Sequence, residues 1–274
     1  RGRRCTHAFL SHPVSRARLF RNYLYVSGTS RTLAQHFAWL ADRVTADVRQ
    51  HQKSSPGPGH PNLGPLRVLE LACNDGTQLD AFKRLGWETY GVDPAANVVP
   101  SAQAKGHRVT VGFWGTEDVW PPQRVPIPVH AIVAQNVLAH VLTPVAFLQA
   151  CARAMDEHTL LYIQTSQCHM HQDGQFDTVY HEHISFFTMH SFAAAAERSN
   201  LTILRFETVP IHGISCLWTL RRKPPQISDP PQPESLSSPT VQLRLNEEVA
   251  LGITSDFFYE RYRARSMETG KWIK

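Results

Sequence analysis

The chain has 274 residues, 42% of them hydrophobic, which is enough for one large domain with smaller additions. It has no run of 18 apolar residues, so we expect no membrane-spanning helix. The net charge is +5, and no aromatic–basic module accompanies the basic clusters; we therefore expect a solvated surface and no nucleic-acid partner. A basic rim that attracts a phosphorylated substrate is the alternative use of that charge.

The five cysteines stand at positions 5, 73, 151, 168 and 216 and form no CxxC pair. This spacing predicts neither a disulfide framework nor a complete zinc site. No apolar core of signal-peptide type follows Arg1. Both observations favour a reducing compartment such as the cytoplasm.

Two segments rich in proline, glycine and serine, 53–65 and 224–240, are expected to be linkers. The N-terminal segment before them, 1–52, ends in a predicted helix over 32–50. Apolar side chains recur there at helical spacing: Leu33, Phe37, Leu40, Val44 and Val48. The last segment, 241–274, is also expected to be helical.

The middle segment, 66–223, alternates predicted strands and helices. Strands are expected over 67–71, 88–92, 108–111, 131–135 and 160–164, with helices over 78–85, 95–105, 145–155 and 189–199. Such alternation predicts an α/β fold with a mostly parallel sheet. Strands over 201–209 and 215–222 are joined by a turn too short for a parallel pair, so they form a terminal antiparallel hairpin. This is the Rossmann-like pattern of class I methyltransferases.

The first predicted strand runs into a tight turn, VLELACNDG, that ends at Gly76. Ligands bind at the carboxyl ends of parallel strands, where Glu70 can accept hydrogen bonds and Gly76 leaves room for close contact. Asp93 ends the next strand 17 residues later and can take both hydroxyls of a ribose. The loop lacks the further glycines of a dinucleotide site, so we expect S-adenosylmethionine. An ordinary strand–turn–helix with a capping residue is the alternative.

Aromatic side chains after the third strand, Phe113 and Trp114, either flank the adenine or belong to the core. The predicted cofactor-binding residues share a place at the carboxyl ends of the strands. They are Glu70, Ala72, Asn74, Gly76, Asp93, Phe113 and Asn136.

The stretch FDTVYHEHISFFT, 176–188, follows the fifth strand and holds Tyr180, His181, Glu182 and His183 in consecutive positions. Methylation of carbon requires an enolate, made by removing a proton next to a ketone. Histidine suits the base, and tyrosine or histidine can donate to the enolate oxygen. We therefore expect carbon methylation.

A metal site is the alternative use of the same region. His169, His171, His181, His183 and Cys168 are potential ligands, and HxH in an extended strand would put both rings on one face. No spacing matches an established zinc pattern, so no metal is predicted. A purely structural histidine cluster also remains open.

Together these motifs resemble the sugar C-methyltransferase family, which methylates nucleotide-linked 4-keto-deoxysugars. The matching stretches are YLYVSGTS at 23–30, LELACNDG at 69–76, GVDP at 91–94, QNVLAH at 135–140 and the block at 176–188. The resemblance implies that His183 and Tyr180 remove the proton and handle the enolate. It implies that Glu182 supports a neighbouring ring and that His140 assists. It also implies substrate contacts from Tyr23, Tyr25 and His181.

The chain departs from the family pattern at several positions. Only Cys5 stands where the family has a four-cysteine zinc module, and the chain ends at Lys274, soon after the leading helix of a second Rossmann-like domain. Ala72 replaces a loop glycine, and Gln164 replaces a glutamate. We therefore expect a family member truncated at both ends. A non-catalytic module that binds S-adenosylmethionine and an O- or N-methyltransferase for a small molecule remain alternatives.

Overall fold

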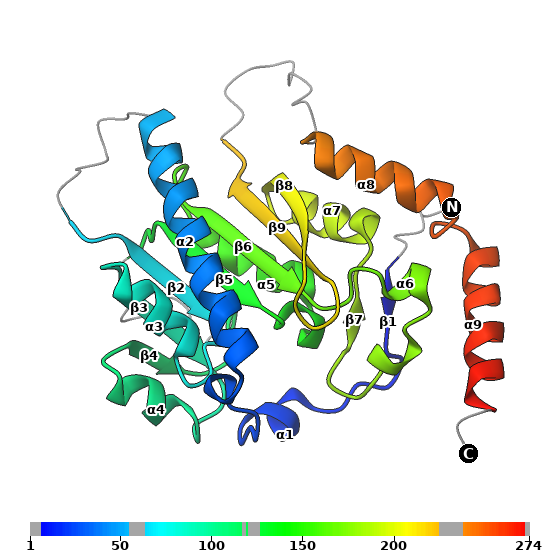
Figure 1. Ribbon diagram of the computed structural model, residues 1–274, viewed down its shortest axis with the longest axis horizontal. Helices are drawn as coiled ribbons and strands as arrows, with labels where there is room; N and C mark the ends of the chain where they lie inside the picture. The colour runs from blue at the N-terminus through cyan, green and yellow to red at the C-terminus, as the bar shows by residue number, and fades with distance from the viewer. Residues whose placement is uncertain (1–6, 55–63, 117–118, 120–126, 225–237, 272–274) are drawn as a thin grey trace.

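The computed structural model describes residues 7–54, 64–116, 119, 127–224 and 238–271, and its centre is one twisted sheet with helices on both faces (Figure 1). The strands of this sheet are β2 (Arg67–Leu71), β3 (Glu88–Asp93), β4 (Arg108–Val111), β5 (Ala131–Gln135), β6 (Leu160–Thr165), β8 (Leu201–Val209) and β9 (Ser215–Arg222). Their order is β4-β3-β2-β5-β6-β9-β8. The first five are parallel to one another, whereas β9 is antiparallel to both β6 and β8. The parallel sheet and the terminal hairpin are therefore confirmed.

The main helices cover the two faces of this sheet (Figure 1). They are α2 (Arg31–Ser54), α3 (Thr77–Arg84), α4 (Val99–Ala104), α5 (Pro144–Arg153) and α7 (Met189–Arg198). One hydrophobic core lies under α2, α3 and α4, and a second lies under α5 and α7. The five apolar side chains predicted for one face of α2 are all buried, which explains how the helix is held on the sheet. In the second core, the rings of Phe192 and Trp218 stack with centroids 4.0 Å apart.

Several short elements were not predicted. They are β1 (Ala8–Phe9), α1 (Arg16–Phe20), η1 (Ser27–Thr29), η2 (Leu138–His140), α6 (Met170–Asp173), η3 (Phe176–Thr178) and β7 (Ser185–Phe186). β1 pairs with β7 in a separate antiparallel sheet. Because this pair joins the N-terminal region to the later part of the stretch 176–188, no local sequence signal marks it.

The C-terminal segment forms two helices, α8 (Pro239–Ala250) and α9 (Asp256–Gly270). The chain turns between them at Gly252, where φ is +72°. α8 packs against α7 and β8, so it lies directly on the core of the sheet domain. Helices extend into both predicted linkers: α2 continues to Ser54, two residues into the linker 53–65, and α8 begins at Pro239, before the end of the linker 224–240. Residues 55–63 and 225–237 lie outside the described part of the chain.

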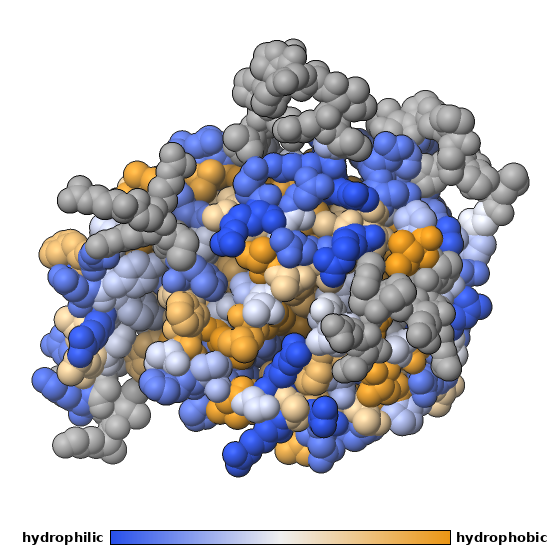
Figure 2. Space-filling view, turned by 180° about the vertical axis from the view of Figure 1, so that it is seen from behind, coloured by the Kyte–Doolittle hydropathy of each residue, from blue (hydrophilic) through white to orange (hydrophobic). Residues whose placement is uncertain are grey.

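The surface mixes apolar and polar side chains. On the face opposite to that of Figure 1, hydrophobic side chains gather near the middle and hydrophilic ones lie around them (Figure 2). Among the described residues, no helix combines the length and the hydrophobicity needed to cross a membrane.

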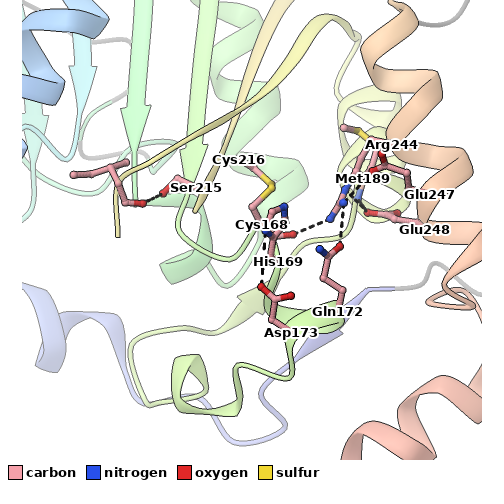
Figure 3. Close-up of a disulfide and its surroundings, with 11 residues drawn as sticks. Cys168, His169, Gln172, Asp173, Met189, Ser215, Cys216, Arg244, Glu247 and Glu248 are labelled. Carbon is pink, nitrogen blue, oxygen red and sulfur yellow. Dashed lines mark hydrogen bonds and ion pairs between the residues drawn. A yellow bond between two sulfur atoms is a disulfide. The ribbon is translucent and has the colours of Figure 1, made fainter. Parts of the chain in front are cut away.

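One disulfide joins Cys168, just after β6, to Cys216 on β9, with the two Cα atoms 4.8 Å apart (Figure 3). The sequence analysis predicted no disulfide framework, and for this pair that expectation is wrong. The antiparallel register places Thr165 opposite Cys216, so the partners meet across strands although 48 positions separate them. Cys73 and Cys151 are buried and free, and Cys5 lies outside the described residues.

Candidate active site

A cavity of about 820 Å³ opens at the carboxyl ends of the parallel strands. Most of the predicted site residues line it, although they come from distant parts of the chain. These are Glu70, Ala72, Asn74, Asp93, Phe113 and Asn136 of the predicted cofactor set, with Tyr23, Tyr25, His140, Tyr180 and His183 of the others. The cavity therefore brings the loops after β2 and β3 together with the stretch after β6. Its size is within the usual range for small-molecule sites.

Glu70 is a buried carboxylate on β2 with one oxygen, Oε2, that has no hydrogen-bond partner. Burial, followed by the charges of Asp93 and Asp75, raises its pKa well above the usual value. A buried polar atom without a partner is costly, so a cationic or hydroxyl-bearing ligand that reached it would be stabilised.

Asp93 lies at the end of β3, where its two carboxylate oxygens accept hydrogen bonds from backbone amides. Oδ2 accepts from the N–H of Asn74 at 2.8 Å, and Oδ1 accepts from the N–H of Ala95 at 2.8 Å. Burial raises its pKa, while these two hydrogen bonds lower it. Each oxygen has a second lone pair, so the carboxylate can still accept from two ribose hydroxyls.

Four non-glycine residues of the cavity wall have left-handed backbone angles that glycine adopts more readily. They are Ala72 (φ +61°), Asn74 (φ +49°), Asn136 (φ +52°) and His212 (φ +51°). Ala72 accordingly stands where the resemblance leads one to expect a glycine. The buried Oδ1 of Asn136 has no partner, so it is free to accept from a ligand in the cavity.

Gly76 is not among the residues that line the cavity, and its cofactor role stays a prediction. It is the N-cap of α3 with φ +79°. A Cβ atom there would lie 2.7 Å from the His107 ring and 3.0 Å from Ala102 Cβ. Glycine is therefore needed for the turn and for packing against α4.

A segment of the N-terminal region crosses the two cofactor loops; we call residues 23–27 the strap. The side chain of Asn97 accepts from the N–H of Tyr23 at 2.9 Å and donates to the backbone oxygen of the same residue at 2.7 Å. Asn74 accepts from a strap N–H at 3.0 Å and donates to the backbone oxygen of Tyr25 at 2.9 Å. The side chain of Asn74 therefore holds the strap, which sequence analysis did not foresee.

Tyr180 and His183 form a hydrogen-bonded pair on the cavity wall. The Tyr180 hydroxyl lies 3.0 Å from His183 Nε2, and His183 Nδ1 lies 2.8 Å from the backbone oxygen of Thr178. Because a carbonyl can only accept, Nδ1 carries the proton and Nε2 is left as the acceptor. Burial lowers the pKa of His183 to about 4, so the imidazole is neutral near pH 7.

His140, Glu182 and Tyr23 surround this pair. The His140 ring centroid lies 5.1 Å from that of His183, and its Nδ1 donates to the backbone oxygen of Glu182 at 2.7 Å. Burial lowers the pKa of His140. The Glu182 carboxylate accepts from the Tyr23 hydroxyl at 3.2 Å. The Glu182 carboxylate therefore supports the ring of Tyr23 in the strap, whereas His140 is held by the backbone oxygen of Glu182.

The structure places His181 on the surface, outside the lining of the cavity, so nothing in this arrangement supports the predicted substrate contact. The metal alternative required His181 and His183 in an extended strand, but the chain turns here instead. The N–H of His183 bonds to the backbone oxygen of Tyr180 at 3.0 Å, and His183 is buried while His181 is exposed. His171 packs against Tyr259 of α9, away from the cavity. Among the described residues, no three His, Cys, Asp or Glu side chains converge as metal ligands do.

Several residues of the cavity wall escaped the sequence analysis. They are Arg16, Ser27, Ser166, Gln175, Asp177, Thr178 and His212. Arg16 also lies over the Phe113 ring, with its guanidinium carbon 4.6 Å from the centroid. Asp177 and Thr178 belong to the stretch already singled out, so it could have indicated them. Arg16 and His212 carry no local signal.

The sequence profile of a methyltransferase domain family matches residues 20–205, which include the loops after β2 and β3 and the stretch 176–188. The chain belongs to the methyltransferase domain family. The order and directions of the strands confirm the predicted class I fold.

Two curated relatives carry different descriptions. C-methyltransferase NovU of Streptomyces niveus is 24% identical over 262 residues, which cover 95% of this chain and 57% of that protein. Ubiquinone biosynthesis O-methyltransferase of Bradyrhizobium sp. (strain ORS 278) is 32% identical over 108 residues, or 38% of this chain and 41% of that protein. The chain thus spans about half the length of these relatives.

Solved structures share the fold at low sequence identity. An S-adenosylmethionine-dependent methyltransferase from Clostridium acetobutylicum ATCC 824 has a TM-score of 0.50 at 9% identity, over 67% of this chain and 91% of that one. A structure of LepI in complex with SAM has a TM-score of 0.51 at 12% identity, over 64% and 46% of the two chains.

The residues of the cavity fit S-adenosylmethionine. Asp93 retains acceptor capacity that two ribose hydroxyls could use. Phe113 lines the cavity with Arg16 over one face of its ring, so an adenine would have to stack on the other face. The unpartnered oxygens of Glu70 and Asn136 can accept from the polar groups of the methionine part.

Proposed function

We propose that the chain methylates a carbon atom next to a ketone, on a nucleotide-linked keto-deoxysugar, with S-adenosylmethionine as methyl donor. The observation that carries this proposal is the neutral His183–Tyr180 pair on the wall of the cavity that the cofactor loops also line. When bound, S-adenosylmethionine supplies an electrophilic methyl group. Acid–base groups beside it are needed for carbon methylation, because the carbon acceptor must first lose a proton.

His183 is the proposed base. Its Nδ1–H is fixed on Thr178, so Nε2 is unprotonated, and its lone pair accepts from the Tyr180 hydroxyl. The structure holds the imidazole neutral, which is the form that can take a proton. The proton leaves the substrate carbon for Nε2, and its electron pair moves into the enolate.

Tyr180 is the proposed donor to the ketone oxygen. Burial and the charge of Glu182 raise its pKa, so the phenol keeps its proton and can donate it. In the described arrangement this hydroxyl bonds to His183. A ketone oxygen that took over this hydrogen bond would free Nε2 to act as base.

The nucleotide-sugar substrate is supported by the resemblance of five sequence stretches and by the similarity to NovU over 95% of the chain. Methylation of oxygen is the second candidate, because the O-methyltransferase relative is 32% identical over 108 residues of this chain. An O-methyltransferase has no need to remove a proton from carbon, and the two candidates differ in that step.

The test is solvent exchange. Incubated in D₂O with S-adenosylhomocysteine and a nucleotide-linked 4-keto-deoxysugar, the protein is expected to exchange the proton beside the ketone well above the rate of buffer alone. Proton NMR of the sugar measures this exchange, and mass spectrometry with S-adenosylmethionine measures methyl transfer. Methyl transfer to oxygen without exchange would contradict the proposal.

The pH dependence should report the depressed pKa of His183. The base works only when unprotonated, and burial lowers its pKa to about 4. We therefore expect kcat/KM to stay level from pH 7 to about pH 5 and to fall below a midpoint near pH 4. Circular dichroism at each pH would check that the protein is still folded. An acid limb centred near 6.5, the usual histidine value, would argue against His183 as the base.

A further inference from the structure

Helix α8 places a charged pair, Arg244 and Glu248, against Cys168 and Met189 (Figure 3). These two residues stand near the ends of the segment 168–190, which contains Tyr180 and His183 and is called the catalytic stretch below. Arg244 is 8% exposed and Glu248 is 2% exposed. Both belong to a helix that lies beyond the residues matched by the methyltransferase family profile. Charged groups buried to this degree must be compensated by several close polar contacts.

Arg244 holds the start of the stretch. Its Nη2 donates to the backbone oxygen of Cys168 at 2.9 Å, and its Nη1 donates to Gln172 Oε1 at 3.2 Å. The same guanidinium lies 3.8 Å from the Glu248 carboxylate and 3.2 Å from Glu247 Oε2. The chain leaves β6 for the catalytic stretch at this point, and the Cys168–Cys216 disulfide lies beside it.

Glu248 holds the end of the stretch. Its Oε1 accepts from the N–H of Met189 at 2.5 Å, and its Oε2 accepts from the N–H of His190 at 3.1 Å and from the ring of that residue at 2.7 Å. These are the first two N–H groups of α7, which have no partner within the helix. The third is accepted by the N-cap Thr188. A carboxylate here is also favoured by the helix dipole.

We propose that Arg244 and Glu248 are positioning residues for Tyr180 and His183. This one pair fixes the catalytic stretch near both of its ends, at Cys168 and at Met189. The chain between these two points therefore holds Tyr180 and His183 in place. This inference rests on the proposed function. A displacement of about 1 Å in a catalytic group can cost on the order of 100-fold in rate, so loosening these ends lowers turnover.

Glu248→Gln is the decisive variant, and Glu247→Gln is its matched control. Both remove one carboxylate from the same helix, but the Glu247 side chain is 48% exposed, and within the described part of the chain its carboxylate pairs with Arg244 at the rim of the cluster. Glu248→Gln is expected to lower kcat about tenfold while the Kd of S-adenosylhomocysteine stays within about twofold. Glu247→Gln should leave both close to the wild-type values. Arg244→Lys should retain more activity than Arg244→Met, because lysine keeps the charge but loses the forked contacts.

Two readouts need no turnover. Amide exchange over 185–192 is expected to be at least about tenfold faster in Glu248→Gln than in Glu247→Gln, since the first N–H groups of α7 lose a charged acceptor. The second readout is the pair of imidazole ¹⁵N resonances of His183, which are assigned by their absence in His183→Gln. In Glu248→Gln these resonances should show a mixture of tautomers, whereas in Glu247→Gln they should show the single wild-type tautomer.

The outcomes separate this inference from the proposed function. Unchanged amide exchange or unchanged His183 resonances in Glu248→Gln would overturn the positioning role. Altered resonances with wild-type kcat would overturn it as well. If the wild-type protein methylated no ketone, the proposed function would fail, while the exchange and the resonances would still decide whether the pair positions the base.

Discussion

Replacing His183 by alanine is expected to lower kcat by about a hundred- to ten-thousand-fold, the usual contribution of a general base. In the proposed mechanism the imidazole accepts the proton from carbon, and in this variant Tyr180 would also lose the acceptor that orients its hydroxyl. Single-turnover methyl transfer to a nucleotide-linked 4-keto-deoxysugar, followed by mass spectrometry, measures the loss. Proton exchange beside the ketone should fall by a similar factor, because the same group performs both steps.

His181→Ala is the matched control for this variant. It removes the same side chain two positions away, where the ring is exposed and does not line the cavity. Its kcat should stay within about twofold of wild type, as surface substitutions cost little. Equal losses in both variants, or full exchange activity in His183→Ala, would rule out His183 as the base.

Asp93→Ala is expected to weaken the binding of S-adenosylhomocysteine by on the order of 100-fold. Two ribose contacts to a carboxylate at about 1.5 kcal/mol each give ~3 kcal/mol. The backbone amides of Asn74 and Ala95 would also lose their acceptor, which loosens both cofactor loops. Isothermal titration calorimetry measures the change in Kd.

A second variant controls for the loss of a negative charge, and thermal melting controls for loss of folding. Asp173→Ala removes an exposed carboxylate outside the cavity and should leave the Kd unchanged. Thermal melting of both variants shows whether they are folded. Wild-type affinity in a folded Asp93→Ala protein would exclude Asp93 from the ribose site.

Local patterns in the sequence were sufficient to predict the sheet. Five of its strands have the predicted bounds, and β3 and β6 are one residue longer. Parallel strands buried on both faces appear as short apolar runs, and the short turn at Gly213 allows only an antiparallel pair. The cofactor loops could be predicted because Glu70 and Asp93 end adjacent parallel strands, whose carboxyl ends meet at one edge.

Contacts between distant parts of the chain could not be predicted in this way. The acceptor that fixes the His183 tautomer is a backbone oxygen, which every residue has, so Thr178 gives no sequence signal. Asn97 and Arg244 look like ordinary polar helix or loop residues until the fold brings them to Tyr23 and Cys168. Gly76 was assigned to the ligand because a left-handed turn and a close ligand approach both demand glycine.

The strap makes the two halves of the cavity mechanically dependent. Asn74 and Asn97 stand on the loops after β2 and β3, yet both hold the segment whose Tyr23 reaches Glu182. A substitution that shifts either loop is therefore transmitted to the far wall of the cavity. A variant in either loop is therefore expected to have two defects at once: weaker binding of the methyl donor and displaced residues on the far wall of the cavity. Measuring Kd for the donor and kcat separately tells the two defects apart.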